Sequence, residues 1–178
     1  MKLFLRLKSW QLIFLAIGLP LLLTIGVKFL FGDKWSFYDL MSKLSMGIYY
    51  SVFMIWNFSV IRYFNKKTQI LTVKQIRLTY LIIPIVFIYG IYLAFPVQLQ
   101  EEYATFYRIL AGSLPFGGFA IIYLSYCSAK LLKTIEHKDT VRTADIVIEL
   151  FLILYFVIGI IWVQKRVNNL YKQEQYDY

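Results

Sequence analysis

Long apolar runs dominate the chain, and short polar stretches separate them. Five runs, at about residues 11–31, 44–64, 78–96, 109–129 and 146–164, each approach the roughly 20 apolar residues that a helix needs to cross a bilayer. They are apolar on every face, whereas the strands of a membrane barrel alternate over about 10 residues. The pattern predicts an all-α membrane protein, a bundle of about five transmembrane helices with short loops, forming one domain over residues 1–178.

The composition agrees with burial in lipid. Hydrophobic residues make up 60% of the chain and charged residues 16%, against about 45–50% and 25% in soluble domains. A chain of 178 residues cannot hide so much apolar surface in water, because small domains bury a limited fraction of theirs. The first run exceeds the ~7–15 residues of a signal-peptide core and lacks a cleavage pattern, so we expect it to remain as a helix.

The net charge of +9 would suit a nucleic-acid-binding protein if Lys and Arg gathered on one soluble face. Instead the 19 basic residues lie between the apolar runs, where flanking cations belong in membrane proteins. We therefore expect the lipid bilayer, and no nucleic acid, as the partner of this charge.

The same cations predict an orientation. With the N-terminus in the cytoplasm, twelve Lys and Arg fall on the cytoplasmic side and seven on the other, so the positive-inside rule favours a cytoplasmic N-terminus. With five spans the C-terminus would then lie outside. Lys165 and Arg166 directly after the fifth run indicate the opposite, because such a pair is typical of a cytoplasmic flank. A cytoplasmic C-terminus requires the first or fifth helix to be re-entrant or interfacial.

An acidic pair at the start of the fifth run is the strongest candidate for chemistry. Asp145 and Glu149 are four residues apart and share a helix face. Acids within spans are costly and often functional, so Glu149 can serve a proton- or cation-linked site. In the structural alternative, which we prefer, the acids favour the positive end of the helix dipole and Thr143 caps it. Lys130 or Lys133 can then pair with either acid, and partner binding is a third possibility.

Two other polar residues are weaker candidates. His137 is the only histidine and lies in a charged stretch that we expect to be a surface loop. Without cysteine partners it is poor evidence for a metal, and Cys127 is the only cysteine. Asn57 lies within the second run, and it or Tyr126 can face a polar path.

A basic loop after the second run carries five cations, and Pro and Gly interrupt three of the runs. The cations can each contribute about 1 kcal/mol of attraction to anionic lipid headgroups; they are Arg62, Lys66, Lys67, Lys74 and Arg77. The interruptions lie at residues 18–20, 84 and 115–118. We interpret them as packing features rather than hinges, because Pro and Gly are ordinary in membrane helices.

The C-terminal run from Glu149 to Gln164, continued by residues 165–168, resembles the ending of a group of small bacterial multispanning inner-membrane proteins. That ending reads E-F-F-L, an aromatic pair, P-I-G-I-W and then Q-P-[RK]-x-N, and the similarity covers about 20 residues. Val157 and Lys165 stand where the pattern carries prolines. The resemblance implies the bacterial inner membrane, and it carries over no activity and no catalytic residue.

The sequence thus predicts a non-catalytic accessory or regulatory subunit that associates with itself or with another membrane protein, without a cofactor. No phosphate loop, nucleophile motif or metal cluster is evident in it. One alternative is a small proton- or cation-coupled transporter, with Glu149 as the coupling acid and Asn57 or Tyr126 facing the path. The other is a lipid-modifying membrane enzyme, with His137 and Glu149 as acid and base.

Overall fold

A computed structural model describes residues 2–31, 35–94, 114–137 and 141–176, with the single residues 105, 108 and 112. Within these ranges every regular element is a helix, so the all-α prediction is confirmed for the described part. Three stretches there are long and apolar enough to cross a membrane: Ser9–Leu30, Met41–Thr68 and Pro115–His137. A bent helix pair makes a fourth if it counts as one span.

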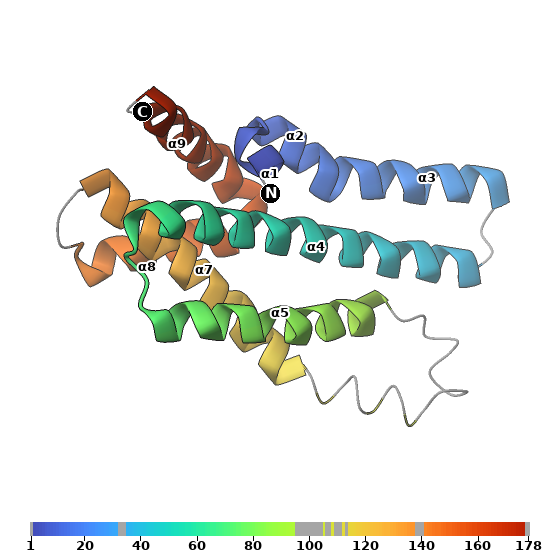
Figure 1. Cartoon of the computed structure of the whole chain (residues 1–178). Helices are drawn as coiled ribbons and strands as arrows, with labels where there is room; N and C mark the ends of the chain where they lie inside the picture. Colours follow the sequence, from blue (N-terminus) through green and yellow to red (C-terminus); the bar gives the residue numbers. More distant parts are fainter. Residues whose placement is uncertain are drawn as a thin grey trace.

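The central element is a long helix that packs against most of the others. In chain order the helical elements are α1 (Lys2–Arg6), α2 (Ser9–Ile13), the π turn η1 (Phe14–Gly18), α3 (Leu19–Phe31), α4 (Trp35–Thr68), α5 (Val73–Ala94), α7 (Leu114–His137), α8 (Thr143–Leu154) and α9 (Phe156–Tyr176). Helix α4 contacts α1, α3, α5 and α7. Figure 1 shows α3, α4 and α5 side by side, with α7 running obliquely to them.

The first helix contains a π turn before its proline. Pro20 has no N–H, and its ring would clash with the carbonyl group of Ala16 in a regular helix. The π turn at Phe14–Gly18 widens the helix just before this position. Beyond it, the Thr24 hydroxyl donates to the Pro20 carbonyl at 2.9 Å and lies 3.1 Å from the Ser45 hydroxyl of α4. The predicted interruption is therefore a local bulge, and polar contacts attach α3 to α4.

The basic stretch between the second and third predicted spans is mostly helical, and the expectation of a loop there is wrong. Helix α4 continues to Thr68 and α5 begins at Val73. Gln69 adopts a left-handed conformation with φ 52°, which is common directly after a helix. Thr72 and Gln75 then form a capping box, in which each side chain accepts from the other residue's backbone N–H.

The predicted spans 44–64 and 78–96 fall within α4 and α5, except for residues 95 and 96, which lie outside the described residues. Of the predicted span 109–129, residues 114–129 lie in α7, which continues to His137, whereas residues 109–111 and 113 lie outside the described residues. His137 is thus the last residue of a helix, and its prediction as a loop residue is wrong. The residues from Lys130 onward remain helical because Leu131 and Leu132 are almost fully buried and hold the last turns of α7 in the core.

The fifth predicted span, 146–164, is not one straight helix. Helices α8 and α9 meet at a bend of 115°, and the α9 ribbon leads back toward the end where α7 stops (Figure 1). Tyr155 leaves the helical region with φ −80° and ψ 53°. We call this bend the elbow. A Cβ on Gly159 would overlap the backbone carbonyl group of Leu152 there. Only glycine permits this approach of the two arms.

Candidate functional site

The acid singled out in the sequence lies in a group of four charged side chains contributed by three helices. We call Lys133 and Glu136 of α7, Glu149 of α8 and Arg166 of α9 the charge cluster. An Arg166 Nη atom donates to Glu149 Oε1. Lys133 Nζ lies 3.7 Å from Glu149 Oε2, and the other Arg166 Nη atom lies 3.4 Å from Glu136 Oε2. The predicted pairing of Lys133 with one of the two acids is confirmed.

Burial within the charge cluster is uneven. The Glu149 side chain is 1% exposed and that of Lys133 is 17% exposed, whereas Arg166 retains 31%. Two acids face two bases, so the group is neutral in sum. A buried carboxylate costs several kcal/mol unless cations and hydrogen bonds offset its desolvation. The two cations offset part of this cost, although Glu149 Oε2 accepts no hydrogen bond. The cluster thereby joins α7, α8 and α9.

The cluster explains why the C-terminal segment folds back. Glu149 and Arg166 are 17 residues apart, so a straight helix would separate them by about 25 Å along its axis. An ion pair between them requires the bend at Tyr155. The charge cluster can therefore form only when the chain bends at the elbow.

The other two polar candidates near the α7–α8 turn are not part of this cluster. Asp145 is in the first turn of α8 and half-buried. Thr143 is the first residue of α8, and Arg142 occupies the N-cap position without a side-chain bond, so the predicted cap by Thr143 is wrong. His137 is exposed. Among the described residues no group of three His, Cys, Asp or Glu side chains is placed to hold a metal ion.

Asn57 lies in a separate buried polar patch between α4 and α7. Its Nδ2 donates to the Phe53 carbonyl group at 3.1 Å, one turn back on the same helix. Its Oδ1 has no hydrogen-bond partner, and neither does the buried Ser125 hydroxyl. Tyr126, the other candidate for a polar path, is half-buried. No hydrogen bond or ion pair among the described residues joins Asn57 to the charge cluster.

A polar centre that sequence analysis did not identify fixes the N-terminal segment. Gln164 of α9 is fully buried, and its Oε1 accepts from Trp56 Nε1 at 2.6 Å. Its Nε2 donates to the Phe4 and Leu7 carbonyl groups at 3.2 and 2.8 Å. Because α1 and the following turn contain these carbonyl groups, Gln164 connects the start of the chain to α4 and α9. The available signal was weak, because Gln164 is the last residue of the apolar run and directly precedes Lys165.

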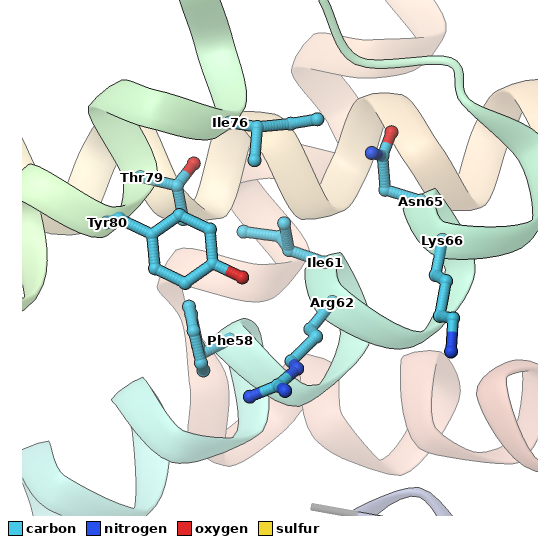
Figure 2. Close-up of a pocket in the computed structure, with 8 residues that line it drawn as sticks. All are labelled: Phe58, Ile61, Arg62, Asn65, Lys66, Ile76, Thr79 and Tyr80. Carbon is cyan, nitrogen blue, oxygen red and sulfur yellow. The ribbon is translucent and has the colours of Figure 1, made fainter. Parts of the chain in front are cut away.

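The basic cluster predicted to contact lipid headgroups is divided between two helices. All five cations are exposed, with Arg62, Lys66 and Lys67 on α4 and the other two on α5. Arg62 and Lys66 line a pocket of about 220 Å³ between these helices (Figure 2). The rest of its wall comes from Phe58, Ile61, Asn65, Ile76, Thr79 and Tyr80. Lys74 and Arg77 do not line it.

The pocket combines apolar walls with a few polar groups. The rings of Phe58 and Tyr80 meet edge to face, with centroids 5.6 Å apart. Asn65 Oδ1 accepts from the Leu71 backbone N–H at 2.7 Å, so the amide nitrogen is the atom turned toward the pocket in Figure 2. The Thr79 hydroxyl donates to the Gln75 carbonyl group at 2.9 Å.

No group in these sites has the arrangement of an acid–base or nucleophilic centre. Glu149 faces two cations, and no described hydrogen bond links it to His137. Comparison with protein families, with curated proteins and with solved structures finds no match to this chain.

Proposed function

We propose that the chain is a non-catalytic accessory or regulatory subunit of a bacterial cytoplasmic membrane that associates through the open face of α3. One observation carries this proposal. Within the chain only 17% of the apolar window of Ser9–Leu30 is buried, against 39% for Met41–Thr68 and 50% for Pro115–His137. A helix with so little cover turns most of its apolar surface outward, which supports a role in contacting another chain.

The open face has the composition of a helix-packing surface. Small residues let membrane helices approach closely, and a Cβ built on Gly26 meets nothing within 4 Å. Large apolar side chains surround this notch: Leu22 is 57% exposed and Phe29 90%. These residues would cover a partner helix that packs on Gly26.

The proposed topology has four spans and a re-entrant hairpin. The spans are α2 to α3, α4, α5 and α7; the 22 residues of α5 measure about 33 Å, which suffices for a hydrocarbon core of about 30 Å. The 12 residues of α8 measure about 18 Å and are too short to cross. Arg166 pairs with Glu136 at the end of α7, so the hairpin returns to the side from which it started.

This topology improves the charge asymmetry. Lys165, Arg166 and Lys172 move to the side of the N-terminus, which changes the balance of Lys and Arg from twelve against seven to fifteen against four. The positive-inside rule then places both termini in the cytoplasm. This topology also explains why Lys165 and Arg166, directly after the fifth apolar run, resemble a cytoplasmic flank in the sequence.

The charge cluster favours this proposal over coupled transport and over lipid chemistry. A coupling acid must exchange its cation, but both oxygens of Glu149 already face resident cations. Neither Glu149, Asn57 nor Tyr126 lines the pocket between α4 and α5.

Purification in a gentle detergent, with mass spectrometry of the chains that remain bound, tests the association. We expect a stoichiometric partner, either a second copy or another membrane protein, that is lost when Gly26→Leu fills the notch on α3. Gly118→Leu is the matched control, because a Cβ there also meets nothing within 4 Å, and it should retain the partner. A monodisperse single chain from the wild type would overturn the proposal.

A further inference from the structure

We infer that the charge cluster binds a water molecule, which joins Glu149 Oε2 to Arg166 Nε and Lys133 Nζ. The site lies where α7, α8 and α9 meet and involves no residue of α3. It is therefore independent of the proposed association through the open face of that helix, and either proposal can fail without the other.

Two buried polar atoms of the cluster have no hydrogen-bond partner in the described part of the chain. They are Glu149 Oε2 and Arg166 Nε. The first is a carboxylate acceptor and the second an N–H donor. Buried polar groups are nearly always hydrogen-bonded, and a group left without a partner costs about 1–3 kcal/mol, or more when it is charged. A water molecule both donates and accepts, so one water can serve both atoms.

The two atoms belong to groups that already touch each other. An Arg166 Nη atom donates to Glu149 Oε1, so the guanidinium and carboxylate groups are in contact through their other atoms. Lys133 Nζ lies 3.7 Å from Glu149 Oε2, which is longer than the about 2.7–3.2 Å of a direct N–H···O bond. A polar contact of this length is typical of a pair that a water molecule bridges.

The remaining polar atoms of the cluster are already engaged. One Arg166 Nη atom donates to Glu136 Oε2 and the other to Glu149 Oε1. Lys133 Nζ lies 3.4 Å from Glu136 Oε2. Glu149 Oε2 and Arg166 Nε are thus what the contacts within the cluster leave over, and they match the acceptor and donor needs of water.

The charge of the cluster favours a neutral ligand over an ion. Two acids and two bases balance each other, so an added cation would meet Lys133 and Arg166, and an added anion would meet Glu136 and Glu149. Among the described residues no group of three His, Cys, Asp or Glu side chains is placed to hold a metal ion. Water adds hydrogen bonds without disturbing this balance.

The exposure of the cluster gives water a way in. The Glu149 side chain is 1% exposed, but its neighbours are only partly covered, with Arg166 at 31% and Glu136 at 21%. Water can therefore reach Oε2 along the Arg166 side chain. Internal waters typically make about three hydrogen bonds to otherwise unsatisfied groups, and Glu149, Arg166 and Lys133 supply that number.

A structure of the full chain at a resolution that shows ordered water tests the inference. We expect a peak within about 3.2 Å of both Glu149 Oε2 and Arg166 Nε. The peak should remain in Asp145→Asn, which alters an acid of α8 outside the cluster, and should be lost in Glu149→Leu with Arg166→Met, which removes both partners. Replacing sodium by rubidium in the buffer should leave its height unchanged, because water carries no exchangeable metal.

The wild-type map decides the question even if the double variant does not fold. A map without the peak, or with Arg166 Nε donating directly to Glu149 Oε2, would overturn the inference. A peak that strengthens in rubidium would assign the site to a cation instead. A peak that persists in the folded double variant would show that other groups hold the water.

Discussion

At the scale of single residues, buried polar groups account for most of the specific structure. The sequence identified Glu149 as a costly acid and Lys133 as one of its possible partners, because a short turn separates their helices. It did not identify Arg166, since a single helix over residues 146–164 would hold it far from Glu149. Gln164 was missed for a related reason: its partners Phe4 and Leu7 are distant in sequence.

Glu149→Gln should lower the free energy of unfolding by about 2 kcal/mol or more, toward the ~3–5 kcal/mol of a fully buried pair, because it removes the buried acid and leaves Lys133 and Arg166 with Glu136 as their remaining acid in the cluster. Thermal unfolding in detergent measures the change. Asp145→Asn makes the same chemical change one turn earlier and should cost less than about 1 kcal/mol, the scale of a helix-dipole interaction. Similar losses in the two variants would contradict the structural role of Glu149.

The transport alternative makes a different prediction for the same residue. If Glu149 were a coupling acid, the double replacement Glu149→Leu with Arg166→Met would not be expected to restore the stability lost in Glu149→Leu. In the structural account it should recover most of the lost stability, because well-packed apolar residues often replace a buried ion pair without loss. Unfolding temperatures of the single and double variants distinguish the two cases.

Gln164→Leu should release the N-terminal segment while the helices remain folded. The change leaves Trp56 Nε1 and the Phe4 and Leu7 carbonyl groups without their partner, and each unsatisfied group costs about 1–3 kcal/mol. Tryptic cleavage after Lys8 should accelerate by at least about tenfold, as 1.4 kcal/mol corresponds to a factor of ten. Gln173→Leu, an exposed position on α9, serves as the control. Unchanged cleavage in Gln164→Leu would show that other contacts hold the segment.

At the scale of elements, apolar runs located the helices but not their ends. Helix α4 extends beyond the predicted span at both sides, and α7 continues to His137. Polar residues at the ends of these helices make contacts that a hydropathy pattern does not contain. Asn65, for example, bonds to Leu71 across the turn after α4. The bend between α8 and α9 depends on a contact between two backbones, which no composition rule reveals.

Gly159→Ala should disrupt the elbow, because its Cβ would overlap the Leu152 carbonyl group and backbone atoms cannot move aside as a flexible side chain can. We expect a loss of about 3 kcal/mol or more, comparable to other strained backbone substitutions. Thermal unfolding in detergent gives this value. Gly26→Ala, on an open helix surface, should be neutral or slightly stabilising. A Gly159→Ala protein as stable as the wild type would exclude the close approach at the elbow.

At the scale of the whole molecule, the proposed re-entrant hairpin of α8 and α9 would decide on which side of the membrane the C-terminus lies. The sequence left two topologies open, five spans or a first or fifth helix that is re-entrant or interfacial, and the charge count alone favoured the first. The ion pair between Arg166 and Glu136 favours the second, because it holds α9 against the end of α7. A hydrogen bond from Arg6 to the Tyr171 hydroxyl, at 3.2 Å, holds the rest of α9 near the N-terminus, and the ring contact of Tyr63 with Tyr171 holds it against α4.

Labelling of single cysteines with a membrane-impermeant maleimide in spheroplasts tests this topology most directly. In a Cys127→Ser background, Asn169→Cys reports on the exposed face of α9, and Gly112→Cys reports on the opposite end of the bundle. The account predicts that Gly112→Cys is labelled in intact spheroplasts and that Asn169→Cys is labelled only after lysis. Labelling of Asn169→Cys in intact spheroplasts would contradict it.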